Sequence, residues 1–151
     1  MTFENPVFAT YVIAASLMIL KLMGQGWITV YRMMKIGGRF LNPEDAAAGV
    51  ANPKPRAGQL EADDYVERSR RMHRNDLENI PAFLVAVLLF ALTQPSLVIA
   101  QVLLYGFVAT RLAHFWAYST AKSHEVRATF FTIGSLIVIG MAIYTLIYAV
   151  A

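Results

Sequence analysis

Residues 67–92, ERSRRMHRNDLENIPAFLVAVLLFAL, decide the fold of this chain. The first twelve of these residues include four arginines, one histidine and three acids, and a long apolar run follows. Pro81 interrupts the pattern, but a membrane helix tolerates one proline when neighbouring groups satisfy the carbonyl that it frees. We interpret the stretch as a membrane-spanning helix whose first turns carry an unusual number of charges.

The composition supports a membrane protein. Hydrophobic residues make up 57% of the 151 residues, whereas ordinary soluble domains contain about 45–50%. The chain has no cysteine, which excludes disulfides, a thiolate metal site and a cysteine nucleophile, and we predict no metal site. The net charge of +3 is modest and the charges flank apolar segments, so nucleic-acid binding explains them poorly.

Four apolar segments are long enough to cross a bilayer, which takes about 20 residues of helix. Turn signals separate them, including two glycines in the first connection and Pro95 in the second. We therefore predict one all-α integral membrane domain over residues 1–151, folded as an up-down four-helix transmembrane bundle. The predicted spans are 7–34, 66–93, 96–120 and 124–150, with a loop over 35–65.

The cations predict how the chain sits in the membrane. Nine of the 13 lysines and arginines lie between residues 32 and 74, and the turn at 93–96 has none. Positive loops stay in the cytosol, so the loop 35–65 and the third connection are expected there, with both termini on the other side. The expected location is the endoplasmic reticulum in a eukaryote or the inner membrane in a bacterium.

The charged turns of the second span form one polar face. At 100° per residue, its members fall within one side of a helix. They are Arg70, Arg71, Arg74, Asn75 and Glu78. A collar of arginines reaching the lipid headgroups is the simpler interpretation, but it does not explain the amide and the carboxylate. Mixed charge just inside a membrane more often marks a polar cavity, which is the interpretation we favour.

The other spans carry polar stripes of their own at helical spacing. Their members are Lys21, Gln25 and Arg32 on the first span, Arg111, His114 and Tyr118 on the third, and Arg127 at the start of the fourth. Together the stripes predict a cation-rich site with one acid near the cytosolic ends of the helices. Its expected ligand is a small polyanion that also carries an ammonium for Glu78.

Glutathione matches that description, because it has two carboxylates, one ammonium and a thiol. A free thiol has a pKa of about 8.5, and an adjacent arginine lowers it. Arginine suits this role better than lysine because it stays charged in a low dielectric. Asp45 has two interpretations: a carboxylate that stabilises the start of a short helix after Asn42, or a catalytic group of the site.

Three stretches also resemble one known family. They are Asn42–Ala46, Val66–Ile80 and Arg111–Tyr118, in that order and with similar spacing over nearly the whole chain. This pattern resembles MAPEG, the membrane-associated proteins in eicosanoid and glutathione metabolism. The resemblance implies a four-helix homotrimer with three glutathione sites between neighbouring subunits.

The resemblance also implies a set of site residues. Arg127 is expected to hold the thiolate, with Arg32 reaching in from the neighbouring subunit. The remaining glutathione contacts implied are Arg74, Asn75, Glu78, His114 and Tyr118, with Arg70, Arg71 and His73 matching positions of the transferase branch. Ala128 and Phe131 depart from the serine and tyrosine of the synthase branch. Ala46 replaces a cysteine of the transferase branch, so activation by thiol reagents is not expected.

Three functions therefore stay open. The first is a detoxifying glutathione transferase for lipophilic electrophiles, with lipid hydroperoxides as further substrates. The second is a glutathione-dependent prostaglandin E synthase-type isomerase, and the third is a non-catalytic lipid-binding scaffold. The complete polar set argues against the scaffold, because such a set is costly in a membrane without its ligand. A small transporter lacks support, because no span is broken by Gly and Pro near its midpoint.

Overall fold

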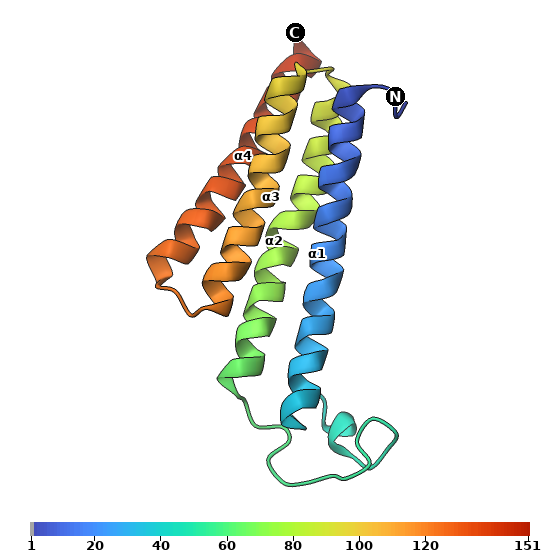
Figure 1. The fold of residues 1–151 in the computed structure, drawn as a ribbon, viewed down its shortest axis with the longest axis vertical. Coiled ribbons are helices and arrows are strands. Elements are labelled where there is room, and N and C mark those ends of the chain that lie inside the picture. Colours follow the sequence, from blue (N-terminus) through green and yellow to red (C-terminus); the bar gives the residue numbers. More distant parts are fainter. Residues whose placement is uncertain (1) are drawn as a thin grey trace. The chain divides into compact units, whose positions relative to one another are not determined.

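Four long helices form the chain in a computed structural model that describes residues 2–151 (Figure 1). Consecutive helices run in opposite directions, as predicted, and each boundary falls within two residues of its expected position. The elements are α1 (Pro6–Ile36), the 3-10 turn η1 (Pro43–Ala46), α2 (Asp64–Leu92), α3 (Leu97–Ser119) and α4 (His124–Val150). Helix α2 continues through Pro81.

All four helices are long and apolar enough to cross a membrane, so the chain is an integral membrane protein. Helix α4 shows this most plainly, because large apolar side chains such as Leu136, Ile139 and Ile143 are exposed along it. A soluble monomer rarely exposes such a continuous apolar surface. In a bilayer the same surface faces lipid or another protein chain.

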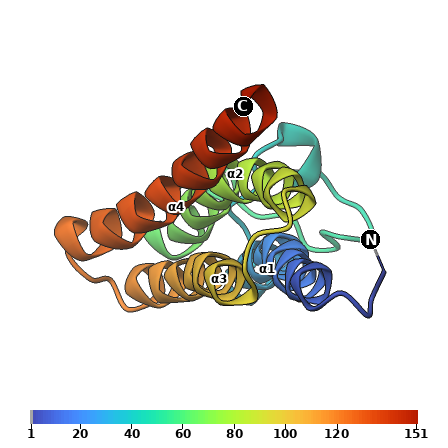
Figure 2. The same ribbon diagram turned by 90° about the horizontal axis from the view of Figure 1, so that it is seen from above.

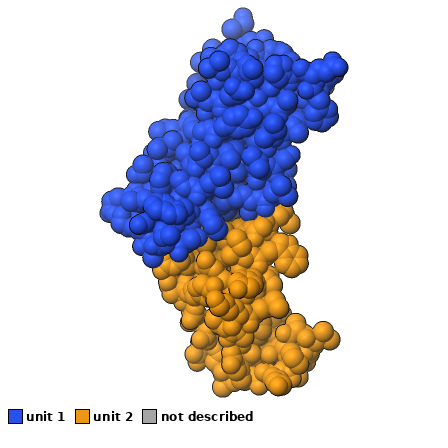
Figure 3. Space-filling model, in the orientation of Figure 1, with its two compact units in different colours: residues 1–22, 75–151 blue, residues 23–74 orange. Residues whose placement is uncertain are grey.

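The chain divides into two compact units, coloured separately in Figure 3. Unit 1 contains residues 1–22 and 75–151, and unit 2 contains residues 23–74. Helices α1 and α2 each contribute one part to each unit, whereas α3 and α4 belong wholly to unit 1.

Unit 1 has a core to which all four helices contribute. Figure 2 shows the four helices from above. The rings of Phe83 on α2 and Phe107 on α3 stack in parallel, with centroids 4.0 Å apart. Met18 from α1 and Met141 from α4 are buried in the same cluster. Because apolar burial gives little advantage over lipid, close packing of this kind is what holds membrane helices together.

Two tight turns link the helices of unit 1. Between α2 and α3, Thr93 donates its hydroxyl hydrogen to the carbonyl of Phe90 at 2.7 Å, and the Ser96 hydroxyl accepts from the amide of Ile99 at 3.4 Å. Between α3 and α4, Ala121 adopts a positive φ of 53°. The turn signals at 93–96 and 119–123 are thus confirmed, and both turns are short enough to keep neighbouring helices antiparallel.

Unit 2 contains the loop that joins α1 to α2. Gly37, with a φ of 62°, ends α1 in the left-handed conformation that glycine tolerates. Arg56 from the loop donates to the carbonyls of Ile36 and Gly37 at 2.6 and 3.0 Å, so it covers the negative end of the helix. Asn42 occupies the expected N-cap position before Pro43, but its side chain makes no hydrogen bond to the amides of η1 and donates instead to Asp45 at 3.2 Å.

Candidate functional site

A pocket of about 230 Å³ lies within unit 1, where α2, α3 and the start of α4 meet. It gathers five of the residues that the sequence predicted for a glutathione site. Its lining consists of Asn75, Glu78, His114, Tyr118, His124, Arg127, Ala128 and Phe131. Ligand pockets usually measure about 300–1,000 Å³, so the space within one chain is small for a tripeptide.

Helix α3 supplies two rings to the pocket from one face. His114 and Tyr118 are one turn apart, and their ring centroids lie 4.9 Å from each other. The imidazole of His114 is buried with 2% exposed, whereas Tyr118 is half-buried. Spacing of four residues aligns side chains along one side of a helix, which is the arrangement that the sequence predicted here.

Helix α4 supplies the cation of the pocket. Arg127 lies in the first turn of α4, where its Nε donates to the carbonyl of Ser123 at 3.3 Å. Its guanidinium carbon lies 4.6 Å from the centroid of the Tyr118 ring, a cation–π distance. The positive end of the α4 dipole is in the same place, so this wall of the pocket attracts an anion.

Helix α2 supplies the acid and the amide. Asn75 and Glu78 are one turn apart and both line the pocket. Glu78 is exposed and forms no ion pair with another of residues 2–151. The pocket therefore offers one unpaired carboxylate and one guanidinium, which suits a ligand carrying both an ammonium and an anionic group.

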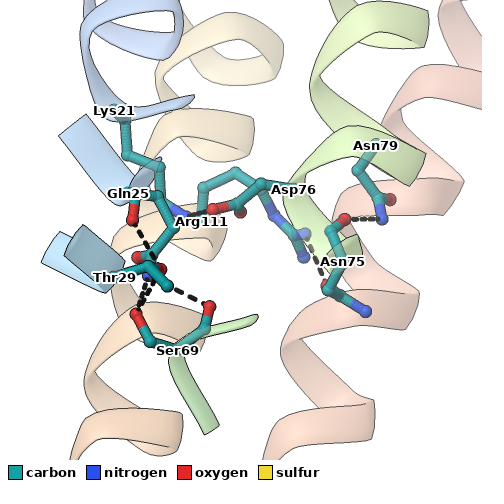
Figure 4. A network of polar contacts seen from close by, with 8 residues as sticks. All are labelled: Lys21, Gln25, Thr29, Ser69, Asn75, Asp76, Asn79 and Arg111. Carbon is teal, nitrogen blue, oxygen red and sulfur yellow. Dashed lines mark hydrogen bonds and ion pairs between the residues drawn. The ribbon is translucent and has the colours of Figure 1, made fainter. Parts of the chain in front are cut away.

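Two members of the polar stripe on the first span, Lys21 and Gln25, serve structure instead of lining the pocket. Within unit 1, Lys21 forms an ion pair with the buried Asp76 (Figure 4). In unit 2, Gln25 donates to the hydroxyl of Ser69 at 2.9 Å, and Thr29 shares a hydrogen bond of 2.8 Å with the same hydroxyl. Polar groups on facing membrane helices satisfy one another in this way.

Arg111 differs from its two neighbours on the third polar stripe. It is completely buried, whereas His114 and Tyr118 reach the pocket. Its guanidinium donates to the side-chain oxygen of Asn75 and to the carbonyl of Phe130, both at 3.3 Å. Arg111 thus holds the pocket wall from behind.

The other predicted site residues belong to unit 2, so the pocket of unit 1 does not include them. Arg70 pairs with Glu67 and also donates to the carbonyl of Arg39. Arg71 pairs with Asp64 at 2.6 Å. These contacts give both arginines a structural role that the helix pattern did not indicate.

Arg32, Arg74, His73 and Asp45 complete the predicted set within unit 2. Arg32 donates to the carbonyl of Tyr65 at 2.8 Å. Arg74 is exposed and makes no ion pair with the other described residues, while His73 is half-buried. Asp45 is exposed, and its carboxylate accepts from Asn42.

Sequence reasoning missed one residue of the pocket lining. His124 is the first residue of α4 and lies three positions before Arg127. That spacing places it beside Arg127 on the helix surface, so the signal was present in the sequence. His124 adds a second imidazole to the pocket, besides that of His114, and its ring nitrogens can donate or accept a hydrogen bond beside the guanidinium of Arg127.

Comparison with known proteins shows that a family model matches residues 3–147. The chain belongs to the MAPEG family. This MAPEG protein is 38% identical to microsomal glutathione S-transferase 1 of Bos taurus, over 92% of this chain and 88% of that protein. Identity to the human protein of that name is 35% over the same shares. Prostaglandin E synthase of Homo sapiens is 28% identical, over 95% of this MAPEG chain and 90% of the relative.

Proposed function

We propose that this protein is a membrane glutathione transferase that conjugates glutathione to lipophilic electrophiles and also reduces lipid hydroperoxides. The observation that carries the proposal is the pocket in which Arg127, Glu78 and Tyr118 converge. The similarity to microsomal glutathione S-transferase 1 supports it. We further propose that the protein resides in the endoplasmic reticulum of a eukaryote or the inner membrane of a bacterium.

The proposed chemistry depends on a thiolate. The thiol of glutathione gives its proton to solvent, and the guanidinium of Arg127 stabilises the resulting anion. Each unit by which the thiol pKa falls below about 8.5 corresponds to about 1.4 kcal/mol in favour of the thiolate. The sulfur then forms a bond to an electrophilic carbon, from which a halide or similar group departs with the bonding electrons.

The remaining residues are proposed to bind the rest of glutathione. Glu78 receives the ammonium, and donors on α2 and α3 receive the carboxylates and carbonyls. The proposed binding set comprises Asn75, His114, Tyr118, Arg70, Arg71, His73, Arg74 and, from the neighbouring subunit, Arg32. Asp45 is proposed to belong to the same site.

An isomerase of the prostaglandin E synthase type is the alternative, because a protein of that name is also similar to this chain. Ala128 and Phe131 line the pocket beside Arg127, and neither has a hydroxyl group. An isomerisation that relies on a hydroxyl beside the thiolate is therefore disfavoured. Assays of aryl-halide conjugation and endoperoxide isomerisation on one preparation distinguish the two, and fast isomerisation without conjugation would overturn our choice. A lipid-binding scaffold without catalysis would show neither reaction.

Glutathione binding tests the site directly. We expect Glu78→Gln and Arg74→Ala each to weaken binding by about 1.5–3 kcal/mol, the usual contribution of a hydrogen bond to a charged group. Calorimetric titration of glutathione into detergent-solubilised protein measures this change. Glu4→Gln is a matched control, because Glu4 is exposed near the N-terminus and does not line the pocket. If neither substitution changes the affinity for glutathione, the charged turns of α2 do not bind it, and their arginines only reach the lipid headgroups.

We also propose that the protein is a homotrimer whose sites each need two chains. The small volume of the pocket within one chain supports this. A second subunit that contributes Arg32 would enlarge the site and add a cation.

Mixed trimers test this assembly. Arg32→Ala and Arg127→Ala proteins are each expected to be inactive alone and to regain part of the conjugation activity when co-expressed. Recovery follows because some interfaces then join the intact half of one subunit to the intact half of another. Trimers that form but stay inactive after mixing would contradict a shared site, and a monomeric protein would contradict the assembly itself.

A further inference from the structure

Arg111 lies directly behind the pocket wall but is not part of the lining. Its side chain is completely buried within unit 1. Nη1 donates to Oδ1 of Asn75 at 3.3 Å, and Nη2 donates to the carbonyl of Phe130 at the same distance. Figure 4 shows the guanidinium extending from α3 toward Asn75. Arg111 therefore connects the third and fourth helices to a residue that does line the pocket.

The surroundings hold the guanidinium in one place. The negative charge of Asp76 attracts it, and the rings of Phe107 and Phe131 lie 5.7 and 6.0 Å from its central carbon. On α4, Gly134 lies against it, since a Cβ there would be in van der Waals contact with Nη2 of Arg111 at 3.4 Å. A side chain enclosed on several sides has little freedom to rotate, so its hydrogen bond to Asn75 has a fixed direction.

That bond determines how the Asn75 amide is oriented. A guanidinium has only donors, so the oxygen of the amide must face it and the nitrogen must point away. The main chain is held as well, because Nδ2 of Asn79 donates to the carbonyl of Asn75 at 3.0 Å. The hydroxyl of Ser135 in turn donates to Oδ1 of Asn79 at 3.1 Å. The two N–H groups of Asn75 are thus the atoms left to meet a ligand.

We propose that Arg111 is a positioning residue which fixes the Asn75 amide, so that this corner of the pocket presents an N–H donor and selects a hydrogen-bond acceptor on the ligand. The acceptor is a carboxylate or carbonyl oxygen, and an ammonium or amide N–H is rejected at this point. The proposal rests on the proposed function for the identity of the ligand, which is glutathione. Arg111 acts through Asn75 and does not touch the ligand.

Replacing Asn75 by aspartate reverses the polarity of this corner at constant shape. The new carboxylate still pairs with Arg111, so the fold is retained, but an oxygen then faces the ligand instead of an N–H. We expect Asn75→Ala to weaken glutathione binding about 5-fold, and Asn75→Asp to weaken it about 10-fold further, because two acceptors oppose each other. Gln94→Glu, an equal change of charge in the exposed turn after α2, is expected to bind normally.

A double-mutant cycle tests the part played by Arg111. We expect Arg111→Met to weaken binding about as much as Asn75→Ala, and the double variant to lose no more than either alone. Arg111→Lys keeps a donor to Asn75 and is expected to remain within about 3-fold of the unaltered protein. Should Arg111→Met fail to fold, the aspartate and alanine variants of Asn75 still test the donor assignment, and Arg111→Lys, alone and combined with Asn75→Ala, tests the positioning role.

The outcomes separate the two proposals. Asn75→Asp binding as well as the unaltered protein, or better than Asn75→Ala, would overturn the donor assignment while leaving the glutathione site intact. Additive losses for Arg111→Met and Asn75→Ala would overturn the positioning role. Failure of the unaltered protein to bind glutathione would overturn the proposed function and this inference together.

Discussion

Arg127→Leu is expected to abolish the thiolate of bound glutathione and to lower aryl-halide conjugation by about 10²–10³-fold, the usual effect of removing one donor from a developing anion. The reason is that Arg127 is the cation among the pocket residues, with its guanidinium held between the Ser123 carbonyl and the Tyr118 ring. Leucine fills a similar space without charge. Thiolate absorbance near pH 7 and the conjugation rate measure the two effects on one sample.

Two variants serve as controls for this result. Arg127→Lys keeps a charge but loses the planar geometry of the guanidinium, so part of the thiolate signal is expected to remain. Lys122→Met removes a cation from the same connection, where Lys122 lies over the Trp116 ring, and is expected to leave both signals unchanged. A thiolate signal that persists in Arg127→Leu would show that another group stabilises the anion.

Asp76→Asn is expected to destabilise the protein by about 3–5 kcal/mol, because removing one partner of a buried pair leaves the other charge uncompensated. Asp76 is fully buried and Lys21 is 11% exposed. The loss of Asp76 leaves two cations, Lys21 and Arg111, in a low-dielectric interior. Thermal unfolding of the detergent-solubilised protein measures the change.

Replacing the other partner of this ion pair should destabilise the protein less. Lys21→Met leaves Asp76 with the attraction of Arg111, so its cost is expected to be smaller than that of Asp76→Asn. As a control, Arg68→Met breaks an exposed pair with Asp64, which is worth about 0–1 kcal/mol. If Asp76→Asn unfolds at the same temperature as the unaltered protein, this pair does not stabilise the bundle.

The helices could be predicted closely from the sequence because each is a long apolar run ended by a turn signal. The partner of the Asn42 side chain could not be predicted, because the element that follows is a single 3-10 turn and the side chain donates to Asp45 instead of capping it. The local sequence shows which hydrogen-bond partners an asparagine side chain can have, but the conformation of the surrounding loop determines which of them it contacts.

The site was predictable in part, for a similar reason. Helical spacing indicates which residues share a face, and His114, Tyr118, Asn75 and Glu78 do meet in one pocket. Spacing does not reveal which partner lies across the gap. Lys21 and Arg111 have the same pattern as pocket residues, but their partners on α2 give them structural contacts instead.

The buried charges also bear on how the protein enters the membrane. Lys21, Asp76 and Arg111 lie on three different helices, well inside each span. Placing one such charge at the centre of a bilayer costs about 2.5–3.5 kcal/mol. During synthesis α1 is made first, so its lysine has no counter-ion until α2 follows. Pairing with Asp76 in the first hairpin removes this cost, so α1 and α2 are expected to associate before α3 brings Arg111 to a pair whose charges already cancel.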